Sequence, residues 1–173
     1  LKTYLEALQQ PEIECISVKI STIFSQISSL AWEDTVEVLS DRLELLYREA
    51  ARMRYRRPDG KEVPKFVYLD MEEYRDMGVT AAAFMGTLDR PGLDQVGAGI
   101  ALQAYLPDAW QVQREINAWA RKRVAAGGAG ITIRLVKGAN LEMEKVDASL
   151  HGWPHAPYAS KLEVDANYRR MLH

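Results

Sequence analysis

The most informative segment of this sequence reads Ile131-Thr132-Ile133-Arg134-Leu135-Val136-Lys137-Gly138-Ala139. It follows a glycine-rich break at 127–130, and its mostly β-branched and apolar residues predict a buried strand over 131–136. Arg134 interrupts that apolar pattern. Because an isolated buried charge is costly, we expect an anion or a polarisable ligand beside Arg134.

The turn after this strand has residues that suit it to bind a phosphate group. Gly138 lets the backbone approach a ligand phosphate closely, with the Lys137 cation beside it. In α/β folds, ligands bind at the carboxyl ends of the strands. A purely structural explanation stays open, because Arg134 can pair with a carboxylate on a neighbouring strand and Lys-Gly is a common turn.

Composition narrows the class of protein. The 173 residues fit one substantial domain, and a net charge of -2 with both signs mixed does not predict a nucleic-acid-binding surface. No apolar run approaches the roughly 20 residues that span a bilayer. The single cysteine, Cys15, excludes an internal disulfide and a cysteine-based zinc site; we expect a buried thiol and a cytosolic protein. His151 and His155 lie in a proline-rich loop, so we expect no metal site.

The order of patterns along the chain predicts an α/β fold. We expect strands at 13–21, 65–71, 99–105 and 131–136, and helices at 1–8, 32–54, 79–88, 108–126 and from 163. We interpret 54–64 as a polar linker with a turn at 58–60. Regular alternation of strand and helix predicts right-handed βαβ units and a parallel sheet.

Each predicted strand carries one polar residue near its carboxyl end: Lys19, Asp70, Gln103 and Arg134. Four such residues on successive strands converge on one site in a (β/α)8 barrel. We therefore expect residues 1–173 to be a partial TIM-like barrel domain of about four βα units. Both ends resemble interrupted helices, so we expect a chain truncated at both ends. Glu72 and Glu73 are expected to cap the helix that follows Asp70.

Four motifs at these strand ends, and two features after them, carry a family resemblance. They are Ser17-Val18-Lys19-Ile20-Ser21, Leu69-Asp70-Met71-Glu72-Glu73, Gln103-Ala104-Tyr105, Arg134-Leu135-Val136-Lys137-Gly138-Ala139, then Tyr158-Ala159-Ser160-Lys161 and Asp165. In this order they resemble the proline dehydrogenase barrel of the bacterial bifunctional proline utilization A flavoproteins. The resemblance runs from about residue 13 to the end of the sequence.

The resemblance implies an FAD-dependent enzyme that oxidises L-proline to Δ1-pyrroline-5-carboxylate and passes electrons to a membrane quinone. It assigns catalytic roles to three residues: Lys19 on the substrate carboxylate, Asp70 positioning that lysine, and Leu135 against the substrate ring. Cofactor contacts are assigned to Gln103 and Arg134 on the isoalloxazine, to Val136, Lys137, Gly138 and Ala139 on the flavin and its phosphate-bearing tail, and to Lys161.

The same resemblance implies a larger protein. It predicts a C-terminal NAD-dependent aldehyde dehydrogenase domain and peripheral association with the inner face of a membrane. Independently of the resemblance, the open sheet edges of a half barrel can pair with another copy, so we expect that oligomers can form. The family's last two barrel strands and its substrate-gripping arginine pair are absent from this sequence, so we expect the chain alone to be inactive. Asn140 replaces an aromatic residue found in another branch of the family.

Two other functions stay open from the residues alone. One is a different TIM-barrel enzyme that binds a phosphorylated ligand at Lys137 and Gly138. The other is a non-catalytic α/β scaffold whose strand-end polar groups pair only with one another. Flavin absorbance in the intact protein separates these alternatives from a proline dehydrogenase.

Overall fold

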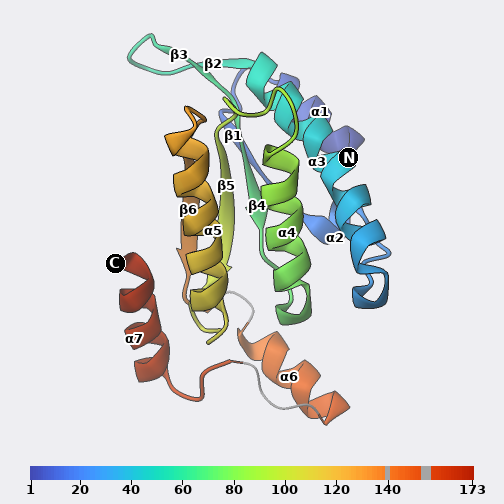
Figure 1. Ribbon diagram of the computed structural model, residues 1–173, viewed down its shortest axis with the longest axis vertical. Helices are drawn as coiled ribbons and strands as arrows, with labels where there is room; N and C mark the ends of the chain where they lie inside the picture. Colours follow the sequence, from blue (N-terminus) through green and yellow to red (C-terminus); the bar gives the residue numbers. More distant parts are fainter. Residues whose placement is uncertain (139–140, 153–156) are drawn as a thin grey trace.

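A parallel four-stranded sheet with helices on one face forms the centre of the computed structural model, which describes residues 1–138, 141–152 and 157–173 (Figure 1). Its strands are β1 (Cys15–Lys19), β4 (Phe66–Asp70), β5 (Ala98–Gln103) and β6 (Ile131–Val136), and they lie side by side in that order. All three pairings are parallel. The structure therefore confirms the predicted α/β class and parallel sheet; the described strands do not close a barrel.

Helices follow the strands as the alternating pattern predicts. The long ones are α3 (Trp32–Arg52), α4 (Met77–Leu88) and α5 (Ala109–Ala125), which stack across one face of the sheet in Figure 1. The others are α1 (Lys2–Gln9), α2 (Ile20–Ile23), α6 (Leu141–His151) and α7 (Lys161–Leu172), with 3-10 turns η1 (Ser29–Ala31) and η2 (Tyr74–Asp76). Helix α6 is not among the predicted helices, because its apolar residues do not gather on one face.

The hydrophobic core lies between the sheet and these three helices. Alternation along β1 and β4 sends every second side chain into it, as with Val18 and Leu69, which are fully buried. Leu39, Leu43 and Leu46 of α3 face them from the helix layer. The other phase of each strand faces away from the helices, and we call this side the open face.

Cys15 belongs to the open face, and this corrects one prediction. It is the first residue of β1, in phase with Ser17 and Lys19 rather than with the buried Ile16 and Val18. Its side chain is therefore exposed, and the predicted buried thiol is wrong.

The predicted polar linker at 54–64 is also wrong. It forms an antiparallel hairpin of β2 (Arg54–Arg56) and β3 (Glu62–Pro64), at the end of the sheet opposite α6 (Figure 1). The turn closes because Gly60 adopts a positive φ of 85° and the Asp59 carboxylate accepts a hydrogen bond from the Lys61 backbone N–H at 3.0 Å. Each strand has only three residues, which is too short for the two-residue alternation typical of a strand to be distinctive in the sequence.

Candidate functional site

The carboxyl ends of the four parallel strands bring the predicted polar residues together. Lys19, Asp70 and Gln103 are the last residues of β1, β4 and β5, and Arg134 lies two residues before the end of β6. All four belong to the open-face phase of their strands, because the register pairs Lys19 with Asp70, Tyr68 with Gly99, and Ala101 with Arg134. With Glu72, which follows β4, we call these residues the strand-end cluster.

Arg134 reaches across β5 to a carboxylate on β4. Its guanidinium forms an ion pair with Asp70 and lies 5.4 Å from the ring centroid of Tyr68. At the register positions beside Tyr68 and Arg134, the strand between them presents the small residues Gly99 and Ala101 on this face. The predicted charge partner of Arg134 is therefore present within the chain, which is the structural explanation that the sequence left open.

Lys19 has a different partner from the one expected. Its ammonium lies 3.6 Å from a carboxylate oxygen of Glu72, whereas Asp70 pairs with Arg134. The other oxygen of Glu72 accepts the backbone N–H of Ser21 at 3.2 Å, so this carboxylate links the end of β1 to the loop after β4. The prediction that Glu72 caps the next helix is wrong, because α4 begins only after η2 and its N-cap is Asp76.

Gln103 is buried and only partly satisfied. Its amide nitrogen donates to the backbone carbonyl of Glu72 at 2.7 Å and to the hydroxyl of Tyr105 at 2.8 Å. Its amide oxygen has no hydrogen-bond partner in the described structure, although the residue is 2% exposed. A buried acceptor without a donor is uncommon and costs free energy, so this oxygen is suited to a donor from a ligand.

Leu135 and Val136, two predicted site residues on β6, lie in different environments. Leu135 belongs to the opposite phase and packs against the core beneath the helices, beside Leu102 in register. The structure does not bring it to the open face. Val136 is half-buried at the strand end, where its carbonyl accepts the backbone N–H of Ala104 at 2.8 Å.

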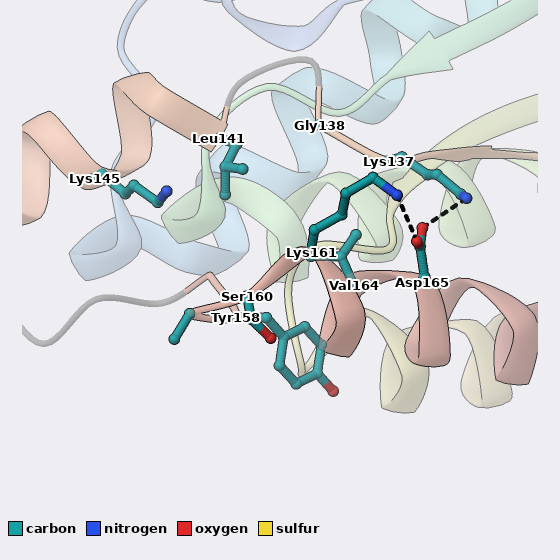
Figure 2. A pocket seen from close by; sticks show the side chains of 10 residues that line it. Lys137, Gly138, Leu141, Lys145, Tyr158, Ser160, Lys161, Val164 and Asp165 are labelled. Atoms are coloured by element: carbon teal, nitrogen blue, oxygen red, sulfur yellow. Dashed lines mark hydrogen bonds and ion pairs between the residues drawn. The ribbon is translucent and has the colours of Figure 1, made fainter.

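A second group of predicted residues lines a cavity of about 350 Å³ between the end of β6, α6 and α7. We call it the lysine pocket, because three lysines line it. Figure 2 shows Lys137 and Lys161 directed at Asp165 from different elements, with Lys145 on α6. The full lining is Lys137, Gly138, Leu141, Lys145, Tyr158, Ala159, Ser160, Lys161, Val164 and Asp165.

Asp165 holds two of these lysines. Its carboxylate oxygens accept from Lys137 at 2.8 Å and from Lys161 at 2.7 Å. These hydrogen bonds, that of Lys137 first, lower the pKa of Asp165 from its usual 3.8 to about 2. The ammonium of Lys137 also lies 4.5 Å from the ring centroid of Tyr168. Both cations are thus directed by α7.

Helix α7 is fixed against the loop after β5. Asn167 is 3% exposed, and its amide donates to the backbone carbonyls of Ala104 at 2.8 Å and Leu106 at 3.4 Å. The helix begins with a capping box, in which Ser160 and Glu163 satisfy each other's backbone N–H groups. These contacts set where Lys161 and Asp165 stand relative to the sheet.

Sequence reasoning missed the roles of several residues. Glu72 was assigned to a helix cap, Tyr68 was counted only as part of a strand, and Asp165 was noted without a partner. For Tyr68 a signal existed: β5 places Gly99 and Ala101 on one phase, which leaves space over that strand for large neighbours. Two predicted or noted site positions, Ala139 and Asn140, lie outside the described residues, as does His155.

Within the described part of the chain, no group of three or more His, Cys, Asp or Glu side chains could hold a metal ion. The helices described here are also too short or too polar to cross a membrane.

Comparison with known proteins decides the family. The sequence model described as Proline dehydrogenase matches residues 2–173. The chain belongs to the proline dehydrogenase family. A curated proline dehydrogenase from Deinococcus radiodurans is 32% identical over 112 residues, which cover 65% of this chain and 29% of that protein.

Solved structures of Proline Utilization A show the same fold. The protein from Corynebacterium freiburgense superposes with a TM-score of 0.89 and 46% identity, covering 99% of this chain and 17% of that one. The protein from Bdellovibrio bacteriovorus inactivated by N-propargylglycine gives a TM-score of 0.81 and 29% identity, over 98% of this chain and 19% of that one. The chain therefore spans less than a third of these proline dehydrogenase relatives.

Proposed function

We propose that this chain is part of an FAD-dependent proline dehydrogenase that converts L-proline to Δ1-pyrroline-5-carboxylate. In this reaction a ring carbon of proline gives up a hydride and the ring nitrogen gives up a proton, so that the C–N bond becomes C=N. FAD, when bound, accepts the hydride and passes the electrons on to a quinone. The protein's own task is to hold the substrate and the cofactor in position.

One observation carries the proposal: polar residues from four neighbouring strands meet at the carboxyl end of the sheet on its open face. Active sites of (β/α)8 barrels are built at this end from several strands. Membership of the proline dehydrogenase family supports the choice of substrate.

Lys19 is the residue proposed to bind the proline carboxylate. Its side chain is 55% exposed and its 3.6 Å contact with Glu72 is longer than a close hydrogen bond, so the ammonium retains donors for an incoming anion. Asp70 contributes indirectly, because it holds the Arg134 guanidinium on the open face. Leu135, whose side chain packs against the core, is proposed to support the strand that carries Arg134 rather than to contact the substrate ring directly.

The residues proposed to hold FAD fit a flavin nucleotide chemically. The buried amide oxygen of Gln103 lacks a donor, and an N–H group of an isoalloxazine supplies one. Arg134 provides a cation that stabilises negative charge on a reduced flavin. Lys137 and Lys161 provide cations for the phosphate-bearing tail, and Gly138 has open space beside its backbone. Val136 and Ala139 complete the proposed cofactor contacts.

We further propose that the chain acts within a longer polypeptide. Its relatives are several times longer, and one solved structure of a similar proline utilization A protein is described as bifunctional. An aldehyde dehydrogenase domain, a cytoplasmic location with contact to a quinone-bearing membrane, and oligomerisation are parts of this proposal. The chain by itself is expected to be inactive, because the four described parallel strands leave the sheet open at β1 and at β6.

An absorbance spectrum of the full-length protein tests the proposal. A flavin band that bleaches on anaerobic addition of L-proline, but not of D-proline, is the expected result. Flavin without bleaching would keep the cofactor and reject the substrate. A folded protein that lacks flavin and takes up no added FAD would favour a phosphate-binding barrel or a scaffold instead.

A further inference from the structure

The aromatic ring of Tyr68 lies where no cofactor or substrate contact has been assigned, yet it touches the one guanidinium of the strand-end cluster. The Arg134 guanidinium carbon lies 5.4 Å from its centroid, within the range of a favourable cation–π contact. The ring also contacts Phe66 of the same strand, with centroids 4.9 Å apart. Tyr68 therefore contacts both an aromatic neighbour and a cation.

Gly99 makes room for this ring. A Cβ built at Gly99 would lie 2.3 Å from two ring carbons of Tyr68, far inside van der Waals contact. Gly99 has no positive φ, so the backbone does not itself require glycine there. The requirement comes from the close approach of the Tyr68 side chain across β5.

Arg134 then has two fixed contacts that approach it across the same strand. The Asp70 carboxylate binds the guanidinium by charge, and the Tyr68 ring presents a face to it. Both come from β4 and both cross β5 over Gly99 and Ala101. A long arginine side chain loses much rotamer freedom when it is fixed, and two contacts of different kind restrict it more than one.

We propose that Tyr68, seated over Gly99, is a positioning residue that sets the orientation of the Arg134 guanidinium toward the flavin. This rests on the proposed function, in which Arg134 contacts the isoalloxazine. Tyr68 itself acts through its ring face, and its hydroxyl is not needed. Gly99 acts only through Tyr68.

Variants of the full-length enzyme separate these roles. Tyr68→Phe keeps the ring and should leave kcat for proline oxidation within about twofold. Tyr68→Leu removes the ring face and should lower kcat by about tenfold, the scale of one cation–π contact, with KM changed by less than twofold. Gly99→Ala should reproduce the Tyr68→Leu loss, and Gly99→Ala combined with Tyr68→Leu should lose no more than Tyr68→Leu alone.

A measurement that does not depend on activity tests the positioning role of Tyr68 even if the proposed function is wrong. The rate at which phenylglyoxal modifies Arg134, followed by mass spectrometry and normalised to the exposed Arg121, should rise several-fold in Tyr68→Leu and stay unchanged in Tyr68→Phe. If the wild type is not bleached by proline but this pattern holds, the proposed function fails and the positioning role stands. Two results would overturn the positioning role itself. One is an equal change of kcat and of the Arg134 modification rate in Tyr68→Phe and Tyr68→Leu. The other is a Tyr68→Leu variant that loses only thermal stability.

Discussion

The ammonium of Lys137 and the carboxylate of Asp165 meet at 2.8 Å, although one follows β6 and the other lies on α7. Lys161 completes the group from the first turn of α7, at 2.7 Å from the same carboxylate. One acidic side chain thus holds two of the cations that line the lysine pocket. An anion that enters the pocket meets lysines whose directions are already set, which lowers the entropic cost of binding.

Lowering the pH should remove the stabilisation that the Asp165 ion pairs provide. The folded-state pKa of Asp165 is about 2, below its usual 3.8, so the ion pairs stabilise the fold fully above about pH 4 and lose that effect as pH falls toward 2. In Asp165→Asn, the Tm deficit relative to wild type should be largest near pH 5–6 and shrink between pH 4 and 2. The exposed Glu12, changed to Gln, is the matched control and should show no such deficit. A deficit for Asp165→Asn that is constant from pH 6 to pH 2 would contradict the assignment.

Lys19→Met in the full-length enzyme should weaken substrate binding and leave the flavin in place. Losing one charge-assisted hydrogen bond to a carboxylate costs about 1.5–3 kcal/mol, which predicts a rise of roughly 10- to 100-fold in KM for proline. Steady-state kinetics and the ratio of flavin to protein absorbance measure both effects. Lys61→Met, in the distant hairpin turn, is the control. If flavin content falls in Lys19→Met but not in Lys61→Met, Lys19 binds the cofactor rather than the substrate.

Asn167 offers a test of how α7 is held. Asn167→Ala removes its hydrogen bonds to two buried carbonyls and should lower the free energy of unfolding by about 1–3 kcal/mol. Asn167→Asp should cost more than Ala, because a carboxylate would face those carbonyl oxygens without a donor. Urea denaturation of the two variants gives the order; an Asp variant as stable as the Ala variant would argue against this contact.

Among the arginines of α5, substitution of Arg123 should lower the free energy of unfolding most. The residue is 8% exposed, and its guanidinium donates to the backbone carbonyls of five residues, which are Leu88, Leu93, Asp94, Val96 and Ala129. Burial lowers the pKa of Arg123, but the usual pKa of arginine is so high that it stays charged near neutral pH.

Arg123→Met removes a donor from each of these carbonyls, although Leu93 and Asp94 keep backbone N–H donors, and should cost about 3 kcal/mol or more in the free energy of unfolding. The exposed Arg121, two residues earlier on the same helix, is the matched control, and Arg121→Met should stay within about 0.5 kcal/mol of wild type. Chemical denaturation measures both. Similar losses in the two variants would mean that helix propensity, not the carbonyl contacts, sets the stability of this region.

The open-face residues could be predicted because strand alternation and parallel order are properties of the local sequence. Lys19, Asp70, Gln103 and Arg134 each end or nearly end a strand, and parallel strands place such ends at one edge. Which cation pairs with which carboxylate could not be predicted. Arg134 skips its neighbouring strand to reach Asp70, and that depends on the size of Ala101 and Gly99 rather than on any charge pattern.

The misassigned segments have similar physical causes. The two strands of the hairpin around Gly60 have three residues each, and the face opposite their charged side chains carries only Tyr55 and Val63, so a two-residue period gives little hydrophobic signal. The exposure of Cys15 depends on which phase of β1 meets the helices, and Ile16 and Val18 take that phase because they are the larger apolar pair. Whether the Cys15 side chain is buried or exposed can be assigned only once that phase is known.

The order of the sheet also bears on how the protein is made. Every neighbour in β1-β4-β5-β6 is also the next parallel strand along the chain, with no later strand inserted between earlier ones. A polypeptide that emerges from the ribosome amino end first can therefore add each strand to an edge that is already assembled, and no completed pairing has to open again. Synthesis and folding can advance in the same direction, one strand–helix unit at a time.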